Sequence, residues 1–181
     1  MKNLIFFCFL SFAFFTSCEN PCATTLCENG GVCVGGECAC KEGWLGSSCS
    51  REDIPSLIEI RELNIRNFPA TLSRNEGWDP SDGPDLYFTI TLGSKVVYSS
   101  DEIIENASSS NSYPFSGLGL GLDAPDSRYL LTLYDSDPGE EDDLIGQAEF
   151  IPYQSGEGFP TSISYSSAGI EFDLRVIYEF E

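Results

Sequence analysis

Two clusters of aspartates are the residues of this chain whose type and spacing favour a specific chemistry. Asp79 and Asp85 lie six positions apart, directly before a hydrophobic run, and Asp135, Asp137 and Asp143 follow another such run. Calcium takes about six to eight hard oxygen ligands, several of them carboxylates from flexible loops. If both loops lie at one end of a domain, these aspartates predict a calcium site. The alternative is a pair of acidic turns, because aspartate favours turns by bonding its own backbone.

The rest of the composition favours binding over catalysis. The chain contains no histidine, which is the commonest general acid–base residue and the commonest metal ligand, so we expect neither enzymatic activity nor a zinc or copper site. Glycoside hydrolysis by two carboxylates is the remaining catalytic alternative. The 29 acidic and 9 basic residues give a net charge of −20, which argues against nucleic-acid binding and against an anionic membrane surface. Such a charge also simply keeps a protein soluble.

Six closely spaced cysteines indicate a small module held together by disulfides. Their spacing is C-x4-C-x5-C-x4-C-x-C-x8-C, within residues 22–49. So short a segment cannot bury enough apolar surface to fold unaided, whereas each bridge typically contributes about 2–4 kcal/mol. The spacing alone does not choose among the possible pairings.

This segment resembles the EGF-like family, in which Asn-Gly-Gly at residues 29–31 and Gly-Trp-Leu-Gly at residues 43–46 have counterparts. The residues before the first cysteine lack the acidic pattern with which some EGF-like modules bind calcium. We therefore expect residues 18–50 to form a spacer or contact module. The family pairing implies the disulfides Cys22–Cys33, Cys27–Cys38 and Cys40–Cys49.

The N-terminus has the features of an export signal. Lys2 precedes a largely apolar, uncharged run at residues 4–15, which is too short for a typical transmembrane helix. Phe-Thr-Ser before Cys18 resembles a bacterial lipoprotein box, with phenylalanine in place of the usual leucine. The resemblance implies cleavage after residues 1–17, a lipid on Cys18, and placement at the outer membrane or cell surface. The alternative is an ordinary signal that leaves Cys18 as a spare thiol, although an odd exported cysteine needs an explanation.

Beyond a polar linker at residues 51–56, the pattern predicts an all-β sandwich over residues 57–181. Apolar and polar residues alternate at residues 172–179, the period of a half-buried strand, and no window predicts a long amphipathic helix. Turn-forming residues separate the runs. We expect the Ser- and Asn-rich segment at residues 99–112 to be mobile, and Trp78 to serve in packing. The predicted strands are residues 57–68, 86–92, 95–98, 129–134, 145–151, 161–165 and 170–180.

The two acidic loops resemble the calcium loops of C2 domains. Asp79 and Asp85 match the paired aspartates of the first loop, and Asp135, Asp137 and Asp143 match the Asp-x-Asp and later aspartate of the other. The last of these precedes two aliphatic residues and a glycine, as in the family. The resemblance implies an eight-stranded antiparallel C2-like β-sandwich with calcium as its cofactor.

Two departures from the C2 pattern affect the expected function. Leu86 stands where the family usually has proline, and residues 140–142 are acidic where membrane-inserting members carry apolar or basic side chains. Docking to lipid in the usual way is therefore not expected. The sequence predicts an exported, lipid-anchored, calcium-binding interaction or adhesion protein with a protein or glycan partner. The alternatives are a metal-independent structural surface lipoprotein and calcium-bridged lipid binding.

Overall fold

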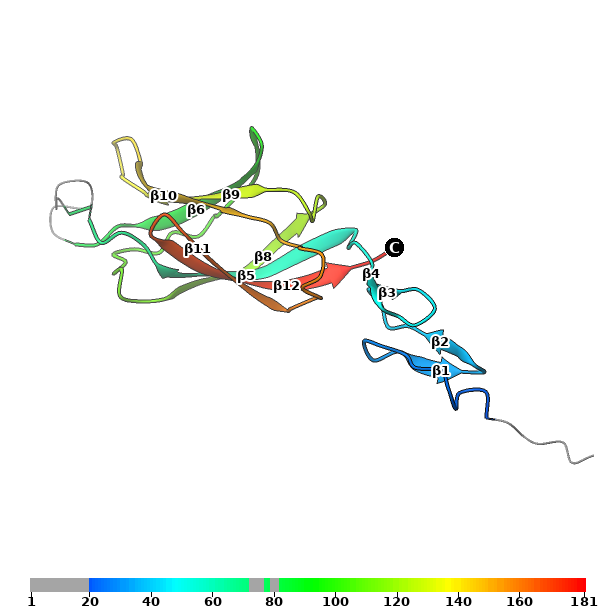
Figure 1. Cartoon of the computed structure of the whole chain (residues 1–181). Coiled ribbons are helices and arrows are strands. Elements are labelled where there is room, and N and C mark those ends of the chain that lie inside the picture. The colour runs from blue at the N-terminus through cyan, green and yellow to red at the C-terminus, as the bar shows by residue number, and fades with distance from the viewer. Residues whose placement is uncertain (1–19, 72–76, 79–81) are drawn as a thin grey trace, which may run out of the picture.

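The computed structural model describes residues 20–71, 77–78 and 82–181. All regular structure in these ranges is β, which confirms the predicted all-β class. The described residues include no helix long and apolar enough to cross a bilayer. Figure 1 shows a small N-terminal part that projects from one end of a larger sandwich. The predicted signal peptide at residues 1–17 and the predicted lipid site Cys18 lie outside the described ranges.

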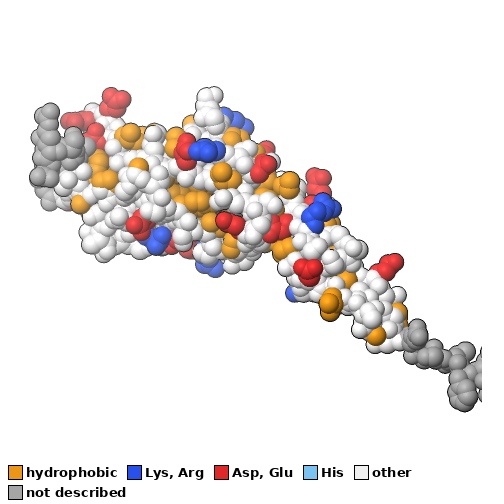
Figure 2. Space-filling view, in the orientation of Figure 1, with side chains coloured by type: hydrophobic (Ala, Val, Ile, Leu, Met, Phe, Trp, Pro, Cys, Tyr) orange, Lys and Arg blue, Asp and Glu red, His pale blue; other side chains and the backbone are white. Residues whose placement is uncertain are grey.

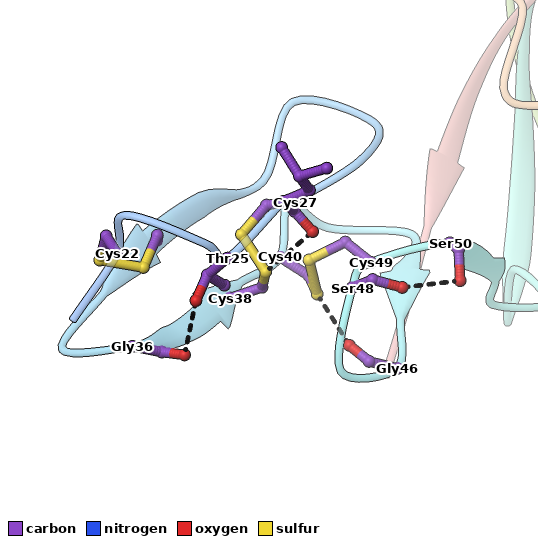
Figure 3. The surroundings of a disulfide bond; sticks show 12 residues. Cys22, Thr25, Cys27, Gly36, Cys38, Cys40, Gly46, Ser48, Cys49 and Ser50 are labelled. Carbon is purple, nitrogen blue, oxygen red and sulfur yellow. Dashed lines mark hydrogen bonds between the residues drawn. A yellow bond between two sulfur atoms is a disulfide. The ribbon is translucent and has the colours of Figure 1, made fainter.

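Residues 20–50, which we call the disulfide module, contain one short hairpin and the first strand of a second, whose other strand follows directly at residues 51–52. Strands β1 (Val32–Val34) and β2 (Glu37–Ala39) pair through a turn, and β3 (Trp44–Leu45) pairs with β4 (Arg51–Glu52). Thr25 donates its hydroxyl to the carbonyl of Gly36, which holds the entering chain against the first hairpin (Figure 3). The three disulfides are the pairs that the resemblance implies, Cys22–Cys33, Cys27–Cys38 and Cys40–Cys49.

The remaining eight strands form two antiparallel four-stranded sheets, stacked as a sandwich. One sheet has the order β10-β9-β6-β7, and the other has the order β11-β12-β5-β8. The predicted count of eight sandwich strands is therefore confirmed. The strands are β5 (Leu57–Asn67), β6 (Leu86–Leu92), β7 (Lys95–Ser99), β8 (Tyr113–Leu122), β9 (Tyr129–Asp135), β10 (Asp143–Phe150), β11 (Ser162–Ser167) and β12 (Ile170–Glu179).

The core lies between the two sheets and follows the alternation of the sequence. In β12, Phe172 and Leu174 are fully buried, whereas Asp173 between them lies on the outer face. Phe88 of β6 and Phe115 of β8 meet edge to face from opposite sheets, with ring centroids 5.0 Å apart. Aromatic pairs of this kind stabilise a core by about 0.5–1.5 kcal/mol beyond the area that they bury.

Strand β8 is the one sandwich strand that the apolar runs did not predict. Its C-terminal half alternates leucine with glycine, and glycine is depleted in strands. Gly117 and Gly119 have φ angles of 69° and 57°, at a point where the register against β5 shifts. A bulge with left-handed residues requires glycine, so the residues that weaken the strand pattern are those that let this strand bend.

The Ser- and Asn-rich segment packs on β6, contrary to the expectation of a mobile loop. Leu86 and Ile104 exchange two backbone hydrogen bonds of 2.9 and 3.0 Å. The amide of Ala107, which is buried, donates to the carbonyl of Pro84 at 2.8 Å. Gly83 lies so close to the Ala107 carbonyl that a Cβ atom at this position would collide with it. The segment therefore packs against residues 83–86, at the described end of the first acidic loop.

Candidate functional site at the acidic rim

Three neighbouring strands bring the acidic loops to the same end of the sandwich. Asp135 ends β9, and its register partners are Leu86 on β6 and Asp143 on β10. Asp85 directly precedes Leu86, so Asp85, Asp135 and Asp143 lie at the same end of the sheet that these three strands form. Figure 2 shows acidic side chains at the end of the sandwich away from the disulfide module. We call this set the acidic rim, formed by Asp85, Asp135, Asp137, Glu140, Glu141, Asp142 and Asp143.

Asp135 is the central and most deeply buried member of the acidic rim. Its side chain is fully buried, and its Oδ1 accepts a hydrogen bond of 2.6 Å from the amide of Asp85. Burying a carboxylate is costly unless hydrogen bonds or positive charge compensate for the lost water. Asp135 therefore ties the first acidic loop to the end of β9, and local positive charge would stabilise it further.

Asp85 connects three segments that are distant in the sequence. Its Oδ1 accepts a bond of 2.8 Å from the amide of Asn106, and its backbone carbonyl accepts one of 2.9 Å from the amide of Ser136. The packed segment at residues 104–107 is thus attached to the first acidic loop, and that loop is attached to the second.

Asp142 organises the second acidic loop, although its spacing did not mark it as one of the calcium ligands. Its Oδ1 accepts a bond of 3.1 Å from the amide of Asp137, and its Oδ2 accepts one of 2.6 Å from the hydroxyl of Tyr87. Burial, together with this hydrogen bond, raises the pKa of Tyr87, so the hydroxyl stays protonated and remains a donor. Tyr87 also stacks on Tyr134 at 5.0 Å. No spacing in the sequence links Tyr87 to an acid 55 positions away.

The acidic rim has the donor chemistry for calcium, since carboxylate oxygens are the donors that this ion takes. Within the described ranges, however, no group of three or more Asp, Glu, Cys or His residues is close enough together to hold a metal ion. Asp85, Asp135 and Asp142 each accept a hydrogen bond from the protein. The fifth predicted ligand, Asp79, lies outside the described residues.

Trp78 lies beside the first acidic loop and has the packing role that was predicted for it. It belongs to the core and donates its indole N–H to the carbonyl of Pro69 at 2.9 Å. A groove of about 370 Å³ runs beside it, lined in part by Phe68, Gly83 and Asn106. Trp78 thus joins the core to the backbone at Pro69, beside the described end of the first acidic loop.

No family model matches this sequence, and no curated protein matches it. Among solved structures, it is similar to human GIVD cytosolic phospholipase A2, with 17% identity and a TM-score of 0.45 over 71% of this chain and 17% of that chain. It is also similar to a C2 domain of plant extended synaptotagmin 1, with 12% identity and a TM-score of 0.43 over 71% of this chain and 98% of that one. The pair of C2 domains of extended synaptotagmin 2 gives 15% identity and a TM-score of 0.39, over 71% and 44% of the two chains.

Proposed function

We propose that this protein is an exported, lipid-anchored interaction protein whose sandwich takes calcium at the acidic rim. The observation that supports this most is that Asp143 pairs with the fully buried Asp135 on neighbouring strands, while Asp85 lies at the same end of the sheet and its amide bonds to the Asp135 carboxylate. Two carboxylates about 4 Å apart repel by about 1 kcal/mol in water and by about 4 kcal/mol at an intermediate dielectric. A divalent cation would remove this repulsion.

Five aspartates would hold the ion, and each comes from one of the two acidic loops. The calcium would neutralise their charge and order both loops around it. Asp135 already joins the two loops through the amide of Asp85, so binding there would stabilise the whole end of the sandwich. The proposed ligands are Asp79, Asp85, Asp135, Asp137 and Asp143.

Export and anchoring are proposed from the N-terminal part of the chain. Three disulfides form and persist in oxidising compartments outside the cytosol, which agrees with a signal at residues 1–17. Because six of the eight cysteines pair with one another and Cys8 lies within the proposed signal, Cys18 is left for a lipid. The disulfide module then acts as a spacer between the anchor and the sandwich, which meets a protein or glycan partner.

A metal-independent surface scaffold is the second candidate, and a specific observation favours it. Three rim carboxylates already accept hydrogen bonds from Asp85, Asn106, Asp137 and Tyr87. Such bonds compensate for part of the negative charge, so the rim would hold its shape without an ion. In this case, the aspartates serve as turn-forming residues that connect neighbouring loops.

Thermal unfolding with calcium, magnesium or chelator separates the two candidates. A ligand at about a hundred times its dissociation constant adds about 2.7 kcal/mol, which raises the melting temperature of a domain of this size by about 10 °C. The calcium proposal expects such a rise with calcium alone and a smaller one in Asp137→Asn. The control Asp101→Asn removes an exposed acid outside the rim and should respond like the native chain. An identical melting temperature in calcium and chelator would leave the scaffold as the function.

A further inference from the structure

The connection between the disulfide module and the sandwich is not a loose linker. Residues 51–56, which were expected to form a polar linker, do join the two parts, but Arg51 and Glu52 form β4 against the disulfide module. The amide of Asp53 donates to the carbonyl of Gly43 at 2.9 Å. The amide of Ser56 donates to the carbonyl of Glu179 on the last strand at 2.8 Å. Hydrogen bonds therefore fix both ends of this segment, one to each part.

The side chain of Glu52 reaches from β4 into a loop of the sandwich. Its two carboxylate oxygens accept bonds of 2.8 Å from the amides of Gly156 and Gly158, and the hydroxyl of Tyr153 adds a third bond of 3.0 Å. Hydrogen bonds to a charged group are roughly twice as strong as those between neutral groups. One residue at the edge of the disulfide module thus holds a loop that is more than a hundred positions away.

A cluster of aromatic rings centred on Phe159 fills the space beside Glu52. Trp44 of the disulfide module packs edge-on against Phe159, with ring centroids 5.6 Å apart. From the sandwich, Tyr153, Tyr178 and Phe180 contact the same ring at 5.9, 5.4 and 5.0 Å. The disulfide module therefore contributes a side chain to a hydrophobic cluster that is continuous with the sandwich.

Gly43 shows how closely the two parts approach. It is buried, and a Cβ atom there would lie 2.6 Å from Phe159 and 2.7 Å from Phe180. Gly46, three residues later, has a similar positive φ (95° against 82°), but nothing lies within 4 Å of its Cβ position. Gly43 is thus needed for close contact between the two parts as well as for its backbone conformation.

The long axis of the sandwich separates this junction from the acidic rim. Strand β5 has 11 residues and begins at the junction, and a strand rises about 3.3 Å per residue, so the sandwich extends about 36 Å from there. Figure 1 shows the disulfide module at one end and the turn between β9 and β10 near the other. The disulfide module adds further length on the side of the N-terminus.

We propose that the disulfide module and the sandwich form one rigid rod, locked by Gly43, Glu52 and Phe159, which holds the acidic rim away from the membrane that carries the anchor. The rim then meets partners on a facing surface and not the lipid of its own membrane. This second step rests on the proposed lipid anchor, whereas the rigidity does not. A hinge at residues 51–56 would let the sandwich fold back, and the contacts described above remove that hinge. Tilting the whole rod would instead bring a strongly acidic protein close to the bilayer, which anionic lipids oppose.

The rigidity can be measured by nuclear spin relaxation on the mature chain, with Cys18→Ser to avoid the lipid. In a rigid rod, backbone amides of both parts report one rotational diffusion tensor. Gly43→Ala should separate them, so that the disulfide module tumbles several-fold faster than the sandwich. Gly46→Ala has the same backbone strain without the collision and should behave like the native chain. If Gly43→Ala fails to fold, Phe159→Ala removes the central ring and should loosen the junction in the same way. Independent tumbling in the native chain would overturn the proposal.

To test the orientation, the lipid-anchored protein is placed on vesicles of phosphatidylcholine and anionic phosphatidylglycerol that contain a fluorescent acceptor lipid. A donor dye is attached through Glu141→Cys at the acidic rim or through Glu37→Cys in the disulfide module, and both positions are exposed. We expect energy transfer to be several-fold lower from the rim, and the difference to shrink in Gly43→Ala. Equal transfer from both positions in the native junction would refute presentation away from the membrane. Because neither experiment contains calcium, failure of the proposed metal site leaves both results interpretable.

Discussion

The disulfide module and the sandwich compensate for the loss of chain entropy on folding in different ways. In residues 20–50, Cys49 is the only hydrophobic residue that is buried, and three covalent bridges restrict the chain. The sandwich contains no cysteine and relies on a continuous core that includes Ile58, Phe88, Tyr129 and Phe172. Chain entropy is therefore countered by cross-links where the segment is too short for a core, and by apolar burial where it is long enough. The comparison implies that each part can be unfolded by a treatment to which the other is insensitive.

Chemical reduction should have the largest effect, and it should affect one part only. Each bridge contributes about 2–4 kcal/mol, so the loss of three leaves the disulfide module without enough stability to fold. Amide spectra in a phosphine reductant should show residues 20–50 collapsing to random-coil positions while the sandwich signals persist. A mock-treated sample serves as the control. Loss of the sandwich signals in the same titration would show that the two parts are not stabilised separately.

Removing a core ring should have the next largest effect, in the opposite part. Phe88 is fully buried between Tyr98 and Phe115, and truncating such a residue typically destabilises a domain by about 3–5 kcal/mol. We expect Phe88→Ala to lower the unfolding free energy of the sandwich by this amount in urea titrations, with the disulfides intact. Ile177→Ala, at a site that is 44% exposed, is the matched control and should change stability by less than about 0.5 kcal/mol. Equal losses in both variants would contradict the assignment of the core.

A substitution at the junction between the two parts should have the smallest effect on stability, and this effect should depend on pH. Burial raises the pKa of Glu52, but the hydrogen bonds from Gly156, Tyr153 and Gly158 outweigh it and hold the pKa below its ordinary value. Because the pKa is lower in the folded protein, Glu52 stabilises the fold above about pH 4 and loses this contribution as the pH falls through the folded-state pKa. Glu52→Gln should therefore lower stability by about 1–2 kcal/mol at pH 7.

Thermal melts from pH 7 to pH 3 test this expectation. The gap between the native chain and Glu52→Gln should narrow towards acid pH, whereas the exposed control Glu102→Gln should show no gap at either end. A gap that stays constant with pH would mean that the carboxylate charge contributes nothing to the junction.

Much of the fold followed from local patterns, and the exceptions have physical causes. Seven of the eight sandwich strands were predicted because they are runs of β-forming residues between turn-forming residues, and residues 172–179 also have the period of a strand. Strand β8 was not predicted, because glycine alternates with leucine there. The structural role of Gly117, which is to adopt a left-handed backbone conformation, becomes clear only from its φ angle. Likewise, the packed segment at residues 99–112 is polar in composition, and its order comes from bonds to Leu86 and Pro84 that are distant in sequence.

In the acidic rim and the junction, too, local sequence patterns predicted some features, whereas contacts between distant residues determine the others. The aspartates were found from their spacing, but their alignment depends on β9 lying between β6 and β10, an order that skips two strands of the chain. The role of Asp142 depends on Tyr87, and that of Glu52 depends on a loop 104 positions away. Contacts of this kind arise from tertiary structure, so no local pattern contains them.

The hydrogen bonds of the segment at residues 51–56 also affect how readily a protease would separate the two parts. Proteases cut exposed, flexible chain, and connections between domains are their usual targets. Here Arg51 and Glu52 lie in a strand, Pro55 is buried, and Ser56 is bonded to Glu179. Within residues 51–56, the backbone is therefore held in a strand at one end and bonded to the sandwich at the other, which would slow cleavage at this connection. With the proposed lipid anchor in place, the sandwich would therefore resist release by cleavage at residues 51–56.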